Sequence, residues 1–97
     1  MRKTELTEEQ QVKFKWLMDA DTVDEDVKVS EFGYLIWKGG TWKDGIWDRG
    51  TWENGTWKDG IWGNGVWKGG LMWSNLKQRN VYVKWDKDKR EFEENLK

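Results

Sequence analysis

Tryptophan is the residue type that gives this sequence of 97 residues its most distinctive chemistry. The chain has ten tryptophans but no histidine and no cysteine. It therefore lacks the commonest general base, the commonest metal ligand and any thiolate or disulfide. We expect no catalytic residue, no metal site and no cofactor. The indole rings are expected to pack in a core or to stack on a partner.

The remaining polar groups fit no familiar catalytic or ligand-binding motif. Asp48 and Glu53 fall on the expected outward corners of a repeat, where solvation keeps carboxylates ordinary. The run Gly63-Asn64-Gly65 is followed by Lys68 where a dinucleotide fingerprint requires glycine. The acidic residues between 19 and 26 lack a third ligand and the glycine of a calcium loop. We interpret this acidic run as the solvated exit of a helix.

Tryptophan and glycine recur with a period of five residues in the middle of the chain. The unit reads Gly-x-Trp-x-x, and the residue after glycine is mostly β-branched. The repeat tryptophans are Trp37, Trp42, Trp47, Trp52, Trp57, Trp62 and Trp67. The glycines between them are Gly40, Gly45, Gly50, Gly55, Gly60 and Gly65, and Gly70 follows. Residues 40–47 recur identically at 55–62, an echo of three units.

A period of five residues suits three extended residues and a corner, because glycine at every fifth position would weaken a helix. In the arrangement that we favour, each unit is one side of a short β-solenoid with tryptophan and glycine facing inward. Its corners are type II turns with positive φ at the residue before glycine. The alternative is a narrow antiparallel meander with Asp/Asn-Gly hairpin turns and a helix covering the indoles.

The Gly-x-Trp-x-x unit resembles the pentapeptide-repeat family, which has a small residue two positions before a central large apolar one. That family uses alanine and leucine or phenylalanine at these positions, and its members are usually longer. The resemblance covers about residues 36–75. The unit also looks like tryptophan-rich repeats of small phage and bacterial proteins. Its similarity to the centre of the MORN repeat is weaker. The first resemblance implies a β-solenoid, and the second implies a phage factor that acts on a host target.

The flanking segments are expected to close the two ends of the repeat. Thr7 followed by Gln10 predicts a capping box, and Val12, Trp16 and Ala20 predict one apolar face of a helix over about 7–20. Alternating residues predict a strand over 80–85. Phe92 and Leu96 indicate a short helix within 87–97. We expect one domain, 1–97, divided into a helical cap (1–26), a repeat β region (27–75) and a C-terminal strand and tail (76–97).

The tryptophans divide into expected core and expected contact residues. We expect Trp42, Trp47, Trp52, Trp57 and Trp62 to form the core together with Gly45, Gly50, Gly55, Gly60 and Gly65. End units lack a stacking neighbour, so indoles near the ends are expected to be exposed. The candidate contact residues for a ligand or partner are Trp37, Trp67, Trp73, Trp85, Lys68, Lys77 and Arg79.

Two functions remain open on this basis. The first is a non-catalytic interaction module that binds a protein partner or itself. The second is an oligomeric binder that sequesters a nucleotide-type small ligand by tryptophan stacking between subunits. The net charge of −1 and the mixed signs at the corners disfavour nucleic acid as a partner. No apolar run is long enough for a bilayer, so we expect no membrane contact and a cytoplasmic location.

Overall fold

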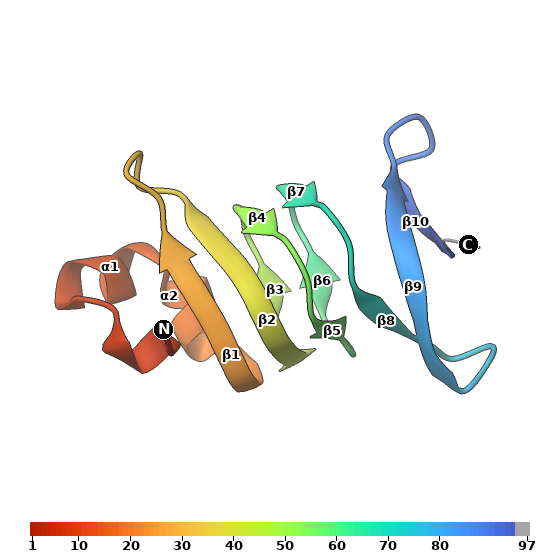
Figure 1. Ribbon diagram of the computed structural model, residues 1–97, viewed down its shortest axis with the longest axis horizontal. Coiled ribbons are helices and arrows are strands. Elements are labelled where there is room, and N and C mark those ends of the chain that lie inside the picture. Colours follow the sequence, from red (N-terminus) through yellow and green to blue (C-terminus); the bar gives the residue numbers. More distant parts are fainter. Residues whose placement is uncertain (95–97) are drawn as a thin grey trace.

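The computed structural model describes residues 1–94, a mainly β fold with short helices at its N-terminal end (Figure 1). The helical elements are η1 (Lys3–Glu5), α1 (Glu8–Lys13) and α2 (Lys15–Asp19). The strands are β1 (Asp21–Val29), β2 (Leu35–Asp44), β3 (Ile46–Trp47), β4 (Thr51–Trp52), β5 (Thr56–Trp57), β6 (Ile61–Trp62), β7 (Val66–Trp67), β8 (Leu71–Ser74), β9 (Arg79–Asp86) and β10 (Glu91–Glu94). The helices lie at one end, the β9–β10 hairpin lies at the other, and the short repeat strands lie between them.

Repeat strands pair in parallel with the strand three units further along the chain. β2 pairs with β4 and β5, β4 pairs with β7, β5 pairs with β8, and β3 pairs separately with β6. Each pairing brings together positions fifteen residues apart, as in Trp37 and Trp52. The larger sheet is mixed and not closed, because β1, β9 and β10 join it with antiparallel pairings. The meander alternative is therefore wrong, since neighbouring units do not pair with each other.

The parallel pairing stacks the indole rings in columns. Trp52 lies between Trp37 and Trp67, at 4.8 and 5.1 Å between ring centroids, with the ring planes within 6° of parallel. Trp57 stacks on Trp42 at 5.2 Å, and Trp62 stacks on Trp47 at 5.3 Å. Rings of successive units meet edge to face, the other favoured aromatic geometry. Of the five tryptophans expected in the core, Trp42, Trp47, Trp52 and Trp57 are buried, whereas Trp62 is half-buried.

The turn at Gly55 shows why the repeat needs glycine. Its φ is +125°, whereas Asn54, the residue before it, is not among those with positive φ. The type II turn expected at the corners is therefore wrong, since the left-handed residue is the glycine itself. A Cβ at position 55 would lie 2.6 Å from the carbonyl oxygen of Gly40 and 2.8 Å from Nε1 of Trp37. Glycine at position 55 therefore gives room to the backbone fifteen residues earlier as well as to an indole. Gly45, Gly50 and Gly55 are half-buried, but Gly60 and Gly65, also expected in the core, are exposed.

The N-terminal helix begins as expected but is broken in the middle. The Thr7 side chain accepts from the Gln10 amide, and the Gln10 side chain accepts from the Thr7 amide, which confirms the capping box. Phe14, at φ −107° and ψ 44°, separates α1 from α2. The break turns Phe14 and Leu17 into the core and leaves Val12 79% exposed. The continuous helix over 7–20 and the inward position of Val12 were therefore wrong.

The acidic run forms a strand rather than a helix exit. β1 starts at Asp21, inside the segment expected to be helical, and pairs with β2 through several irregularities. Glu25 is buried, and it accepts hydrogen bonds from the Thr22 hydroxyl (2.8 Å) and the Lys3 amide (3.1 Å). Its carboxylate also lies 3.2 Å from Nε of Arg2. Glu25 thus connects the N-terminal residues to the sheet.

We expect the Glu25 carboxylate to make stability depend on pH. Burial opposes its ionisation, but the bonds from Thr22 and Lys3 and the charge of Arg2 outweigh this and lower the pKa of Glu25. A lowered folded-state pKa stabilises the fold above the unfolded-state value, about 4.3, and this contribution is lost as the pH falls through the folded-state pKa. Thermal unfolding at a series of pH values should show this loss, and Glu25→Gln should reduce stability at neutral pH and flatten the acid limb.

The matched control for this variant is Glu31→Gln, which removes an equally charged but exposed carboxylate. We expect Glu31→Gln to unfold at the same temperature as the unmodified chain at every pH. An unchanged acid limb in Glu25→Gln would show that other carboxylates carry the pH dependence.

The C-terminal segment folds back over the end of the repeat. β8 pairs antiparallel with β9, which confirms the strand expected over 80–85, and β9 pairs with β10. Val81 and Val83 of β9 are buried. The short helix expected within 87–97 is wrong, because residues 91–94 form the strand β10. Leu96, which was part of that expectation, lies outside the described residues.

Candidate functional site

Two of the tryptophans expected to be exposed at the ends of the repeat are buried. Trp37 pairs with Val27 of β1 and has no exposed surface. Trp67 donates its indole N–H to the carbonyl oxygen of Val83 (3.1 Å), and the Phe92 ring lies 4.9 Å from it. The expectation was wrong for both residues because the flanking segments supply the neighbours that the end units lack.

The other two candidate tryptophans lie apart from each other. Trp73 is 37% exposed on β8, and its indole N–H donates to the Asn75 side chain at 3.0 Å. Trp85 is half-buried on β9 and meets Phe92 edge to face at 4.8 Å. The structure therefore does not combine the predicted tryptophans into one stacking site.

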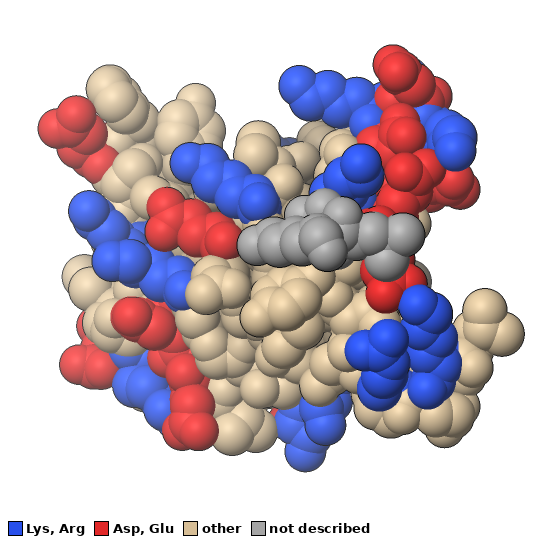
Figure 2. All heavy atoms as spheres, turned by 45° about the vertical axis from the view of Figure 1, so that its right-hand side comes forward, with Lys and Arg blue, Asp and Glu red and all other residues tan. Residues whose placement is uncertain are grey.

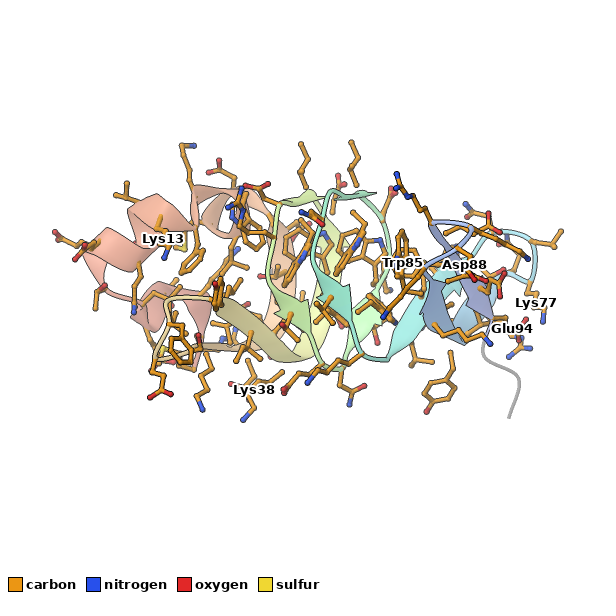
Figure 3. The ribbon with its side chains drawn as sticks, turned by 90° about the horizontal axis from the view of Figure 1, so that it is seen from above. Lys13, Lys38, Lys77, Trp85, Asp88 and Glu94 are labelled. Carbon is orange, nitrogen blue, oxygen red and sulfur yellow. The ribbon has the colours of Figure 1, made fainter. Side chains whose placement is uncertain are left out.

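Of the three basic candidates, Lys77 and Arg79 lie at the β8–β9 turn and Lys68 lies apart from them. Lys77, in the turn between β8 and β9, forms an ion pair with Glu94. These two residues lie with Trp85 at the β9–β10 end of the molecule, far from Lys13 at the helical end (Figure 3). Arg79 is exposed where β9 begins, and Lys68 is exposed directly after β7, where its amide donates to the carbonyl oxygen of Trp52. No common anion site follows from these positions.

The outward side of the β3–β6 pair carries the most regular apolar surface of the repeat. Ile46 and Ile61 are direct neighbours in the parallel register, and they are 56% and 61% exposed. We call this surface the isoleucine face. At the corresponding outward positions of the other strands, threonine interrupts the apolar residues at 41, 51 and 56. Exposed apolar neighbours of this kind are typical of contact surfaces.

A groove borders the isoleucine face on its helical side. α2 packs against β3, and Trp16 of α2 meets the Trp47 ring at 4.9 Å. The groove, of about 500 Å³, is lined by Trp16, Ala20 and Ile46 with Lys15, Asp19 and Asp48 at its margin. The groove therefore extends the apolar surface of the isoleucine face and adds charged groups to it.

A second hollow lies where the repeat meets the β9–β10 hairpin. We call it the aromatic cleft. Its volume is about 370 Å³, and its lining includes the aromatic residues Trp57, Trp62, Trp85 and Phe92. Met72 and Gly60 complete the apolar part, and Arg90 and Glu91 supply the charged groups. The repeat strands do not enclose this space by themselves, because the hairpin forms one of its walls.

Charge on the surface is mixed in sign. On the face shown in Figure 2, Lys and Arg side chains alternate with Asp and Glu around an uncharged centre. An acidic surface that imitates DNA would need a continuous field of one sign.

Across residues 1–94, no cluster of three or more possible metal-ligating side chains occurs. Within the same residues, none of the helices has the length and apolar character that crossing a bilayer requires.

Sequence reasoning missed the isoleucine face and the charged residues of the aromatic cleft, although it named Trp85 as a contact residue. Ile46 and Ile61 were treated as strand formers, although the identical Gly-Ile-Trp triplets at 45–47 and 60–62 mark them as a pair. Arg90 and Glu91 carry no local signal, and Phe92 suggested a helix. The β9–β10 hairpin brings all three residues to the indoles. Comparison with protein-family models, with curated proteins and with solved structures gave no match.

Proposed function

We propose that this chain is a non-catalytic interaction protein, a short β-solenoid that binds a protein partner through the isoleucine face. The observation that carries the proposal is the exposure of Ile46 and Ile61 side by side in register. The parallel pairings at fifteen-residue spacing support a solenoid with three units in each coil. The stacked indoles make such a scaffold rigid, because rotation of one ring requires movement of its neighbours.

The surroundings of the face favour a protein as its occupant. Protein interfaces combine an apolar centre with a polar rim. The corner residues beside the face provide that rim in both signs, as Lys43 and Asp44 on one coil and Lys58 and Asp59 on the next. A partner with an apolar ridge and mixed charges on either side fits this arrangement. Nucleic acid fits it poorly, because the rim offers no excess of positive charge.

The repeat itself suggests the variant that tests this function. Ile46→Thr together with Ile61→Thr places threonine where other units of the same repeat already carry it. Each replacement removes about 1 kcal/mol of the free energy that burying a half-exposed isoleucine in the interface would provide. Partner affinity should therefore fall about 30-fold. The thermal unfolding temperature should stay within a few degrees. The partner is first isolated by photo-crosslinking from position 61. Its binding to the unmodified chain and to the double variant is then measured by calorimetry.

The control is Val66→Thr, which makes a similar change on β7, where the outward side chain is 54% exposed but lies on a different face. We expect it to leave binding unchanged. Equal loss of affinity in Val66→Thr, or retained affinity in the double variant, would contradict the proposal. Sedimentation of the unmodified chain provides a further test, since a dimer that the double variant dissociates would assign the face to self-association.

A further inference from the structure

One column of stacked side chains is shorter than the other two. Two columns have three members each, and the third ends at Trp62. The columns are Trp37, Trp52 and Trp67; Trp42, Trp57 and Met72; and Trp47 and Trp62. Among the described residues, no ring lies parallel to Trp62 on the side away from Trp47.

Phe92 fills only part of the space beyond Trp62. Its ring stands nearly perpendicular to the Trp62 ring, at 5.7 Å and 82°, and also meets Trp67 and Trp85 edge to face. Trp62 is consequently half-buried, unlike Trp47 below it in the same column. The aromatic cleft opens beside Phe92, and Trp62, the last ring of the short column, forms part of its lining.

The size and chemistry of the cleft define a class of ligand. A volume of about 370 Å³ lies within the range of small-molecule sites and accepts a fused ring. Indole faces favour a planar aromatic ring stacked at the spacing already present in the columns. Arg90 donates hydrogen bonds and Glu91 accepts them, so the pair matches a ring with acceptors and donors on its edge.

We propose that the aromatic cleft binds a planar heteroaromatic ring of the nucleobase class, stacked on Trp62 as the missing third ring of its column. Arg90 and Glu91 pair with polar groups on the edge of that ring. Recognition rests on the ring and not on a phosphate, because the two charged groups of the cleft cancel each other. The cleft belongs to a single chain, and the proposal does not depend on the isoleucine face or on the protein partner.

A titration followed by NMR tests the site directly. The isotopically labelled full chain is titrated to millimolar concentration with adenine, with adenosine monophosphate and with ribose phosphate as separate probes. Adenine and adenosine monophosphate should shift the indole N–H signals of Trp62 and Trp85 and leave that of Trp37 unchanged. Ribose phosphate should shift none of them. The absence of any shift, or equal shifts with ribose phosphate, would overturn the proposal.

Two variants separate stacking from edge recognition. Trp62→Leu should weaken binding of adenosine monophosphate about tenfold or more, because it removes the stacking surface. Arg90→Asn should weaken it several-fold and leave the fold intact, because Arg90 is exposed at a φ of +55° that asparagine tolerates. Its control is Arg79→Asn, which removes the same charge from the other end of β9. Equal affinities in Arg90→Asn and Arg79→Asn would overturn the assignment of Arg90 and of the cleft.

Discussion

Gly55→Ala should lower the unfolding temperature by about 10–50 °C. The new methyl group would lie 2.6 Å from a backbone carbonyl oxygen and 2.8 Å from the Trp37 indole nitrogen, at a φ of +125°. Backbone strain of about 1–3 kcal/mol and overpacking of about 1–3 kcal/mol add at this site. For a chain of this size, each kcal/mol lowers the unfolding temperature by about 4–8 °C. Differential scanning calorimetry measures the shift.

Gly39→Ala is the matched control for this change. A Cβ at Gly39 meets nothing within 4 Å, and Gly39 is not among the residues with positive φ. We expect a change of less than about 1 kcal/mol, in either direction, because alanine also reduces the freedom of the unfolded chain. If the two alanine variants unfolded at the same temperature, the close approach of neighbouring coils at Gly55 would not be a determinant of stability.

Trp52→Ala should destabilise the chain by about 3–5 kcal/mol, the usual cost of truncating a large buried aromatic side chain. Trp52 has no exposed surface and stacks on one ring above and one below. Its indole N–H has no hydrogen-bond partner among the described residues, so the whole loss comes from ring contacts and burial. Urea unfolding followed by circular dichroism measures the free energy.

The comparison variant is Trp73→Ala, which truncates an indole that is 37% exposed outside the stacked columns. We expect a loss of about 1 kcal/mol or less, mainly from its bond to Asn75. Equal losses at positions 52 and 73 would mean that stacking within a column adds nothing to the burial of an indole.

The five-residue unit could be predicted from the sequence because its physics is local. Indole and glycine alternate on the inner side, and the residue between them is β-branched. The partner of each strand is not local information. A period of five residues is compatible with pairing to the next unit or to the third unit, and only the observed pairing at fifteen residues decides between them.

The ends of the molecule were the hardest part to predict from the sequence. Trp37 and Trp67 are the first and last tryptophans of the repeat, but Val27 and Val83 approach them from segments on either side of it. Glu25 sits in an acidic run that suggests solvent exposure, and its burial depends on Thr22 and on the N-terminal residues. Such long-range contacts leave no periodic trace. Arg90 and Glu91 of the aromatic cleft could not be predicted for the same reason, although Trp85 was expected to be a contact residue.

The fifteen-residue pairing distance sets the step by which such a gene can lengthen. The N-terminal helices contact Trp47 and the C-terminal hairpin contacts Trp62 and Trp67, so each flanking segment packs against particular columns of the repeat. After an in-frame duplication of fifteen codons, both flanking segments would pack against the same columns that they already cover. An insertion of five or ten codons would instead place one flanking segment against a different column. The identical stretches at 40–47 and 55–62 are spaced by that same step.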